Sequence, residues 1–347
     1  MCDDIRDGNT RGIFLRGCFL LYLSLLMSMP LKAQEGRQGV SVAWWNVENL
    51  FDLHDDPHTN DDEYTPQGQR HWTRRRLDAK LRGIYKTLVM MDLPDVVGLA
   101  EVENKWVLRE LTGGTPLSRA GYRYVHYDSP DRRGIDVALL YRQDRFRVLS
   151  SRAVSVSDSS NHFFTRDILV VEGVTAAGDS LCVLLNHWPS KRGGDEAERH
   201  RKRIADTLRH LMVELHAKYP EAAVVALGDM NAAAEEAPIS EGMGFGNDSV
   251  SPDGIRLLTL RLPKAWGSHK YQGVWSYIDQ VFLLAGDGWW VNDLRLMSFH
   301  HLLTEEKGRP GLRPRRTHLG ERYEGGISDH LPLLLRLKRA GKRNPNQ

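Results

Sequence analysis

The stretch Ile327-Ser328-Asp329-His330-Leu331-Pro332 joins an acid directly to a histidine near the C-terminus of the chain. Earlier, Leu227-Gly228-Asp229-Met230-Asn231 places an acid two residues before an amide. Two further stretches, Trp45-Asn46-Val47-Glu48 and Leu99-Ala100-Glu101-Val102-Glu103, also end short apolar runs with acids or amides. Strand ends that carry such side chains are typical of a site for a hard metal ion and a phosphate. The pattern therefore predicts metal-assisted hydrolysis of a phosphoester.

The distribution of apolar residues predicts a mixed α/β fold. Buried strands are expected over residues 39–45, 95–99, 136–141, 168–173, 181–186, 223–227, 277–283 and 331–337. Helices are expected over 73–90, with Lys80 on its polar side, and over 195–219, with Asp195 as N-cap. No Pro/Ser-rich linker divides these elements. One α/β domain over residues 40–338 is therefore expected, followed by a basic, fraying tail at 339–347.

The first 33 residues differ from the rest of the chain. Arg6, Arg11 and Arg16 precede an apolar run over residues 18–29, and Ala33 stands before a polar start. This order is typical of a secretory signal peptide, and the run is too short to span a membrane. A buried helix or an inefficient anchor is the alternative. We therefore predict an exported protein, periplasmic or secreted, with no transmembrane segment in the mature chain.

Charge and cysteine content narrow the class further. The 47 Lys and Arg residues nearly balance the 45 Asp and Glu residues, so attraction to phosphate must be local rather than spread over the surface. Without residues 1–33, Cys182 is the only cysteine of the three, which excludes an intramolecular disulfide. Its apolar surroundings predict a small buried hydrophobe.

The acid–amide and acid–histidine stretches supply the candidates for catalysis. Strand alternation sends Asp229 and Asn231 to the same side, where the acid can orient or deprotonate water and the amide can bind a phosphate oxygen. His330 can act as an acid or base, or can stabilise charge, and needs an acid on its other nitrogen. Asp279 is the candidate for that acid. An ordinary turn after a strand, or a surface Asp–His turn, is the alternative in each case.

Other strand ends supply candidates for cation and phosphate binding. Glu101 ends an apolar strand, and Asn46 and Glu48 share one face of another, which suits Mg²⁺, Mn²⁺ or Ca²⁺. Arg133 is a candidate phosphate ligand, as are Lys191 and Arg192, which stand near a helix start. For His187, which ends a further strand, a structural and a catalytic role are equally open. A solvated turn arginine is the alternative for Arg133.

These residues resemble the endonuclease/exonuclease/phosphatase superfamily. The matching stretches, in the order of the family, are Trp45-Asn46-Val47-Glu48, Leu99-Ala100-Glu101, Asn186-His187-Trp188, Gly228-Asp229-Met230-Asn231, Tyr277-Ile278-Asp279 and Ser328-Asp329-His330. The resemblance implies a four-layer α-β-β-α sandwich, with two packed mixed sheets flanked by helices. It also implies that Glu101 binds the divalent cation with Asn46 and Glu48 nearby, and that Asp329 contacts it through water.

The resemblance assigns further roles in catalysis. Asp229 would position the attacking water and Asn231 the phosphate. His330, oriented by Asp279, would stabilise the transition state, and His187 would be a second group on the phosphate side.

Two further expectations rest on the residues themselves. Of the two basic stretches, the loop with Arg309, Arg313, Arg315 and Arg316 is a better candidate for contact with substrate than the polar side of the helix over 73–90, because it is nearer the predicted site. Trp289-Trp290 is expected to pack its indoles on the core.

The function expected from the sequence is a metal-dependent phosphodiester hydrolase that acts on nucleic acid as a nuclease and is a monomer. The alternative is a phosphatase or phospholipase-type phosphoesterase on the same fold, with an inositol phosphate or a sphingomyelin-like substrate. A third possibility is a binding protein of the cell envelope that kept the scaffold without catalysis. The full set of acids, amides and histidines argues against this last class.

Overall fold

The computed structural model describes residues 39–340. The predicted signal peptide and all but the first two residues of the predicted tail lie outside the described residues. Of those two residues, Arg339 ends the last strand, and the backbone N–H of Ala340 donates to the carbonyl of Gly288. No helix in this part of the chain is long and apolar enough to cross a bilayer.

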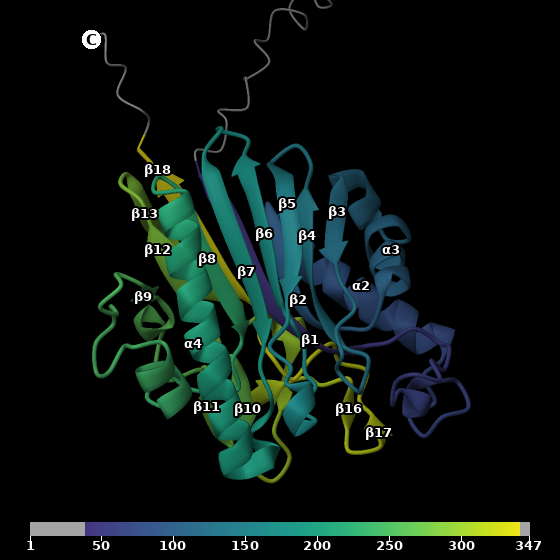
Figure 1. The fold of residues 1–347 in the computed structure, drawn as a ribbon. Coiled ribbons are helices and arrows are strands. Elements are labelled where there is room, and N and C mark those ends of the chain that lie inside the picture. The colour runs from purple at the N-terminus through teal and green to yellow at the C-terminus, as the bar shows by residue number, and fades with distance from the viewer. Residues whose placement is uncertain (1–38, 341–347) are drawn as a thin grey trace, which may run out of the picture. The chain divides into compact units, whose positions relative to one another are not determined.

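Two mixed sheets form the centre of the fold (Figure 1). The first has the order β13-β18-β1-β2-β4-β3, with bounds Trp289–Leu296, Leu333–Arg339, Val40–Leu50, Val96–Val102, Asp136–Arg142 and Tyr122–His126. The second has the order β5-β6-β7-β8-β12-β9, with bounds Phe146–Val154, Ile168–Thr175, Ser180–His187, Ala223–Asp229, Asp279–Ala285 and Arg256–Leu257. Only β1–β2 and β7–β8 are parallel pairs, so each sheet is antiparallel on both sides of its centre.

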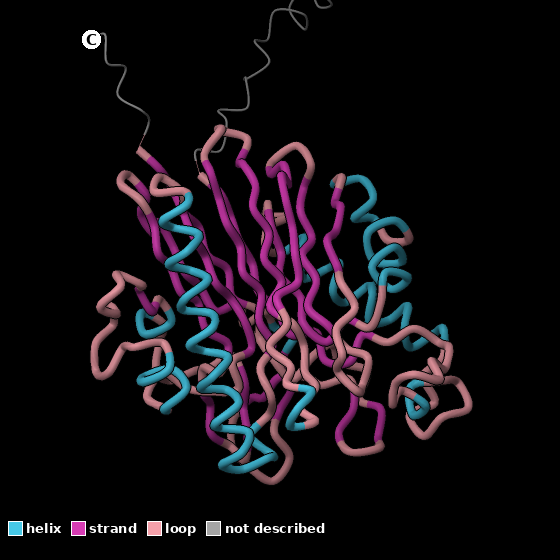
Figure 2. The backbone as a smooth tube through the Cα atoms, viewed as in Figure 1, coloured by secondary structure: helices cyan, strands magenta, loops and turns pink. Residues whose placement is uncertain are grey.

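Helices cover the outer face of each sheet (Figure 2). α2 (Arg74–Met90) and α3 (Lys105–Gly113) bury residues such as Leu77 and Leu108 in one apolar cluster with Trp45 of the first sheet. α4 (Gly194–Lys218) buries its apolar side against the second sheet. A third apolar layer, which includes Leu185 and Leu335, lies between the two sheets. The predicted four-layer α-β-β-α sandwich is confirmed.

The two parallel pairs decide where polar strand ends meet. A helix crosses from β1 to β2 and another from β7 to β8, so the carboxyl ends of each pair lie together. Contacts of Asn46 with Asp229 and of Glu101 with His187 place both pairs of ends at the same end of the sandwich. β12 runs antiparallel to β8 and places its first residue, Asp279, opposite Asp229. β18 runs antiparallel to β1, so the residues just before it, including His330, also lie at this end.

Shorter elements complete the chain. Three hairpins are formed by β10 and β11 (His269–Tyr271 and Val274–Ser276), β14 and β15 (Leu303–Glu305 and Leu312–Pro314), and β16 and β17 (His318–Leu319 and Arg322–Tyr323). Single helical turns lie at Asp62–Tyr64, Pro116–Ala120, Ser159–Asn161, Lys191–Gly193, Pro238–Gly242, Thr259–Arg261 and His300–Leu302.

Several local predictions need correction. α4 begins at Gly194 with Gly193 as its N-cap, so Asp195 lies in the first turn, where it complements the helix dipole. Lys80 is buried rather than on the polar side of α2. Of the two indoles expected on the core, Trp289 is buried and Trp290 is 43% exposed, because neighbours on a strand face opposite sides. Cys182 is buried, as predicted.

Candidate active site

Asn46 joins the two sheets at the centre of the site. Its side-chain nitrogen donates to Glu101 Oε1 at 3.3 Å and to Asp229 Oδ2 at 3.1 Å, and its side-chain oxygen accepts the backbone N–H of Glu48. The residue is 1% exposed. Because both donated bonds end on carboxylates, Asn46 fixes the distance between the acid of the first sheet and the acid of the second.

The strand ends of the first sheet are irregular. The parallel register of β1 and β2 shifts between Asn46 and Leu50, and Glu48, Asn49 and Glu101 have φ values of 52°, 56° and 61°. Such left-handed conformations are uncommon for residues other than glycine and cluster at functional sites. Here the backbone N–H of Asn49 donates to Glu101 Oε2 at 2.8 Å, so the turn itself holds the carboxylate.

The strand ends of the second sheet are regular. β7 and β8 keep their register to the last residue, where His187 lies opposite Asp229. A Cβ atom on Gly228 would lie 2.5 Å from the carbonyl oxygen of Asn186, so this close approach requires glycine. Asp229 Oδ1 accepts the N–H of Asn231 at 3.0 Å, and Asn231 donates from its side chain to the carbonyl of Trp188.

A buried acid–histidine–acid chain crosses the second half of the site. His330 Nδ1 lies 2.7 Å from Asp279 Oδ2, and His330 Nε2 lies 3.6 Å from Asp229 Oδ2. Trp44 donates to the other oxygen of Asp279, which fixes that carboxylate. Burial alone would lower the pKa of His330, but Asp279 and Asp229 outweigh it and raise the pKa well above the ordinary value. His330 is therefore a protonated, oriented donor in this arrangement.

His187 is held in the opposite protonation state. Burial, with Arg166 and Arg133 nearby, lowers its pKa well below the ordinary value, so the ring is neutral. Its Nε2 lies 3.8 Å from Glu101 Oε1 and 3.7 Å from Asp229 Oδ2. Arg166, which the sequence did not single out, donates to the carbonyls of His187 and Trp188 and pairs with Asp131 at 2.8 Å. Arg166 therefore holds the backbone at the end of β7 through these two carbonyls.

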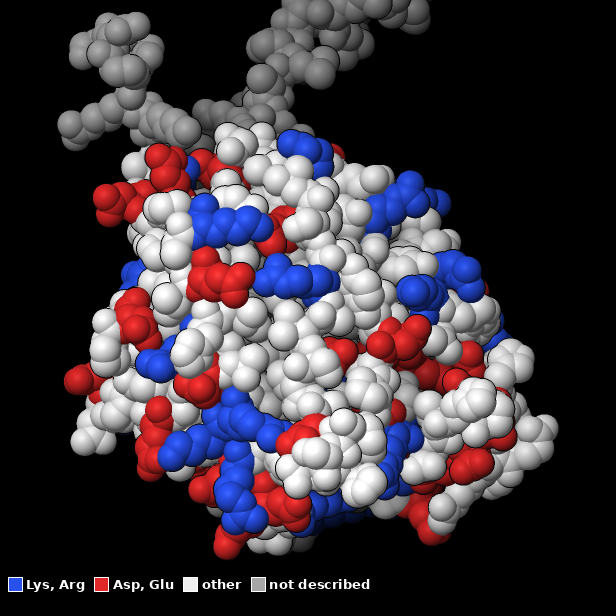
Figure 3. Space-filling view, viewed as in Figure 1, with Lys and Arg blue, Asp and Glu red and all other residues white. Residues whose placement is uncertain are grey.

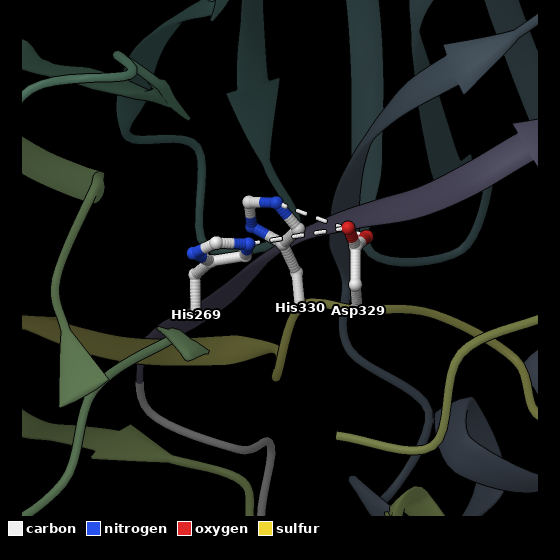
Figure 4. Close-up of side chains that lie close together, drawn as sticks. All are labelled: His269, Asp329 and His330. Carbon is white, nitrogen blue, oxygen red and sulfur yellow. Dashed lines mark ion pairs between the residues drawn. The ribbon is translucent and has the colours of Figure 1, made fainter. Parts of the chain in front are cut away.

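Asp329 lies between Arg316, which the sequence offered as a contact for substrate, and His269, which the sequence did not place at the site. It forms an ion pair with Arg316, and His269 Nε2 lies 4.0 Å from its Oδ2 (Figure 4). Burial opposes ionisation of Asp329, but His330 and Arg316 outweigh it and lower the pKa of the carboxyl. Burial lowers the pKa of His269 to about 4. His269 lies on a short hairpin that pairs with His330 by an isolated bridge, and no local pattern announces it.

Lys80 lies beneath Glu48 with almost no exposure. Its ammonium group donates to the carbonyls of Glu48 and Ile327 and to the hydroxyl of Thr317. Thr317 in turn donates its backbone N–H to Glu48 Oε2 at 2.7 Å. Burial lowers the pKa of Lys80 and raises that of Glu48. The lysine therefore connects the end of β1 to the segment that precedes Asp329.

The predicted phosphate ligands are not equally placed. Arg133 is half-exposed and close enough to His187 to lower its pKa, whereas Lys191 forms an exposed ion pair with Glu236. Arg192 is exposed. In the basic loop, Arg313 pairs with Glu324 and only Arg316 reaches an acid of the site. Figure 3 shows basic side chains gathered around the lower end of α4 but interspersed with acidic ones.

The site fits a divalent cation by its charge and donor chemistry. Its carboxylates outnumber its cationic side chains: Glu48, Glu101, Asp229, Asp279 and Asp329 face Lys80, Arg316 and His330. Burial raises the pKa of Glu48 and of Asp229, which indicates that these acids are short of positive partners. Since Asn46 turns its nitrogen toward the acids, Glu48, Glu101 and Asp329 remain to hold a hard cation.

Two tighter groups of possible ligands also occur here. The ligand atoms of His269, Asp329 and His330 lie within 4.8 Å of one another, as do those of Asp229, Asp279 and His330. In the second group, the Nδ1 of His330 is already hydrogen-bonded to Asp279 at 2.7 Å. That nitrogen is therefore already engaged by a carboxylate within the group.

Comparison with known proteins agrees with this geometry. Residues 41–339 match the Endonuclease/Exonuclease/phosphatase family, and the chain belongs to that family. This class includes metal-dependent nucleases and phosphatases. None of the curated proteins matches the sequence.

Several solved structures share the fold. Zebrafish (D. rerio) TDP2 complexed with a single-strand DNA product has a TM-score of 0.56 and 16% identity, covering 86% of this chain and 98% of that one. A mannosyl-6-phosphatase from Bacteroides thetaiotaomicron has a TM-score of 0.54 and 15% identity, covering 86% and 99%. The human Nocturnin catalytic domain with bound sulfate has a TM-score of 0.54 and 15% identity, covering 87% and 95%. These likenesses establish the architecture and leave the substrate open.

Proposed function

We propose that this protein is an exported, divalent-metal-dependent phosphodiester hydrolase that acts on nucleic acid. One observation carries the proposal. Asp229 lies between an amide that leads to Glu101 and a histidine that leads to Asp279, so a cation-binding half and a proton-transfer half meet at one carboxylate. Hydrolysis of a phosphoester by water needs both halves.

The side chains divide the chemistry as follows. Glu48, Glu101 and Asp329 would hold the cation, which when bound supplies positive charge to the non-bridging oxygens of the phosphate. Asp229 orients the attacking water and takes its proton. His330, kept protonated by Asp279, donates to an oxygen of the phosphate as negative charge develops. His187 remains neutral and can donate to a second oxygen. Asn231 holds the Asp229 carboxylate through its backbone N–H.

A nucleic-acid substrate is supported by the hairpin beside the site. β10 begins at His269, next to His330, and leads to Tyr271, which is 67% exposed. An exposed aromatic ring beside a phosphate site can stack on a base without selecting its identity. The shared fold with TDP2, solved with a single-strand DNA product, is in keeping with this substrate.

A phosphatase acting on a small phosphoester is the second candidate. Cationic side chains near the site are largely engaged with acids, as Lys191 is with Glu236 and Arg313 with Glu324, which leaves few to follow a long polyanion. The Bacteroides mannosyl-6-phosphatase covers this chain as fully as TDP2 does. A small substrate would need only the pocket itself.

An activity panel separates the two candidates. The chain from residue 34 is stripped with EDTA and assayed with Mg²⁺, Mn²⁺ or Ca²⁺ on plasmid DNA, single-stranded oligonucleotide, sugar phosphate, phosphoinositide and sphingomyelin. The proposal expects metal-restored cleavage of DNA that His330→Ala lacks. Restored release of phosphate from sugar phosphates, with DNA intact, would establish the second candidate instead. A metal-replete protein inert on every phosphoester would contradict both.

A further inference from the structure

His126 is a buried histidine that the catalytic site does not use. It ends β3 in the first sheet, and its side chain is 0% exposed. Among residues 39–340, neither of its ring nitrogens has a hydrogen-bond partner. Buried polar atoms are nearly always paired, so an imidazole with both nitrogens unpaired needs an explanation.

Two carboxylates face this ring. His126 Nε2 lies 3.4 Å from Asp136 Oδ2, and Nδ1 lies 3.7 Å from Asp128 Oδ1. Ligand atoms of the three residues lie within 4.8 Å of one another. His126 pairs with Ala138 across the sheet, and Asp136 lies on the same face of β4 as Ala138. The sheet itself therefore holds the histidine and one of the acids together.

A small cavity meets this cluster at Asp136, whereas His126 and Asp128 are not among the residues that line it. Its volume is about 10 Å³, and Tyr127, Ser129, Asp136 and Asp167 are among the residues that line it. That volume suffices for a single water molecule or ion. Within the described part of the chain, Oδ1 of Asp167 is also buried without a hydrogen-bond partner. Unsatisfied polar atoms thus occur on His126, which faces Asp136, and on Asp167, which lines the same cavity as Asp136.

We propose that His126, Asp128 and Asp136 form a second cation site, separate from the catalytic one, for a transition-metal ion of the Zn²⁺ or Mn²⁺ type. One imidazole with two carboxylates suits such ions better than Mg²⁺ or Ca²⁺, which prefer oxygen alone. The competing explanation is an imidazolium that pairs with both acids and binds no metal. The experiment below distinguishes these two explanations.

The proposed site has a structural consequence. Asp128 and Asp136 lie near the two ends of the loop between β3 and β4, so a cation bound to both would hold the ends of that loop together. The loop contains Asp131, whose Oδ2 accepts from Arg166 at 2.8 Å, and Arg166 holds the carbonyl of His187. A cation here would therefore stabilise the loop whose Asp131 pairs with Arg166, the residue that holds the carbonyl of His187, without contacting the substrate.

Metal binding tests the proposal directly. Metal-stripped chain from residue 34 is titrated with Zn²⁺ by calorimetry, and with Co²⁺ by its visible absorption. Glu101→Gln serves as the background that weakens the catalytic site. In this background we expect a binding event that Asp128→Asn weakens by at least about 10-fold and His126→Asn abolishes. We also expect Zn²⁺ to raise the melting temperature of the background protein more than that of Asp128→Asn.

Asp128→Asn keeps the test decisive, because this side chain is 76% exposed and its replacement leaves packing intact. Equal Zn²⁺ stoichiometry and affinity with and without Asp128→Asn would overturn the proposal. So would the absence of any binding event in the Glu101→Gln protein, together with a protonated His126 ring in its NMR spectrum. Either result concerns this cluster alone and leaves the proposed hydrolase activity untouched.

Discussion

Each of the two parallel strand pairs, β1–β2 and β7–β8, is connected by its own crossover helix, yet the two pairs end differently. β7 and β8 stay in register up to His187 and Asp229. β1 and β2 lose their register after Asn46, and Glu48 and Glu101 follow in left-handed conformations. At the regular end the side chains of His187 and Asp229 are each 3% exposed, whereas the Glu101 side chain is 14% exposed.

This difference assigns separate tasks to the two sheets. A regular, dry strand end holds a proton-transfer group at a fixed distance and shifts its pKa by burial. At the irregular end Glu48 is buried, but Glu101 is partly exposed, so that a cation can enter and exchange there. Variants of the second sheet should therefore reduce turnover, and variants of the first should change metal dependence.

The largest effect is expected for Asp229→Asn. It keeps the shape of the side chain but removes the base, so kcat should fall by about 10²–10⁴-fold. The concentration of Mg²⁺ that gives half-maximal activity should change little. Steady-state kinetics across a Mg²⁺ titration would measure both, with thermal unfolding as the control for the fold. Turnover close to that of the wild type would refute the role of Asp229.

A smaller loss, of about 10²-fold in kcat/KM, is expected for Asp279→Asn. Asp279 raises the pKa of His330, so its removal should lower that pKa. Because the protonated ring is the active form, activity falls as the pH rises through the pKa of His330. In the variant this fall should occur at a lower pH than in the wild type. The pH profile of kcat/KM would show its alkaline limb displaced toward acid. An unchanged limb would mean that His330 does not act as the protonated group.

Glu101→Gln should act on the metal rather than on turnover. Loss of one carboxylate ligand should raise the Mg²⁺ concentration for half-maximal activity by at least about 10-fold, while kcat at saturating metal falls less than in Asp229→Asn. Recovery of activity after EDTA treatment, followed against added Mg²⁺, would measure this shift. An unchanged metal requirement would contradict the division between the sheets.

Lys80→Met should have the smallest effect on turnover and act mainly on stability. The change leaves the carbonyls of Glu48 and Ile327 and the hydroxyl of Thr317 without their buried donor. The free energy of unfolding should fall by about 2–5 kcal/mol. Lys86→Met, an exposed site on the same helix, is the matched control and should change it by less than about 0.5 kcal/mol. Equal stability of both variants in urea would show that Lys80 is not a structural tie.

Local patterns predicted most of the central strands, because each is a short apolar run with a polar end. The edge strands β3 and β5 were missed, since only some of their residues are buried and the pattern is diluted. Lys80 was misplaced although its spacing from Leu77 and Ile84 puts it on the buried side of the helix. A charged residue at such a position indicates that its side chain is buried and forms hydrogen bonds or ion pairs inside the protein.

The sequence by itself determined the fold class and the identity of most acids, amides and histidines at the site, because strand periodicity and strand-end chemistry are local properties. Only the tertiary structure decided which of them touch. It turned the nitrogen of Asn46 toward Glu101 and Asp229, brought His269 and Arg316 to Asp329, engaged Lys191 with Glu236, and left His126 buried between two acids. These contacts join segments far apart in the chain, and their geometry depends on how two sheets pack, which no local pattern encodes.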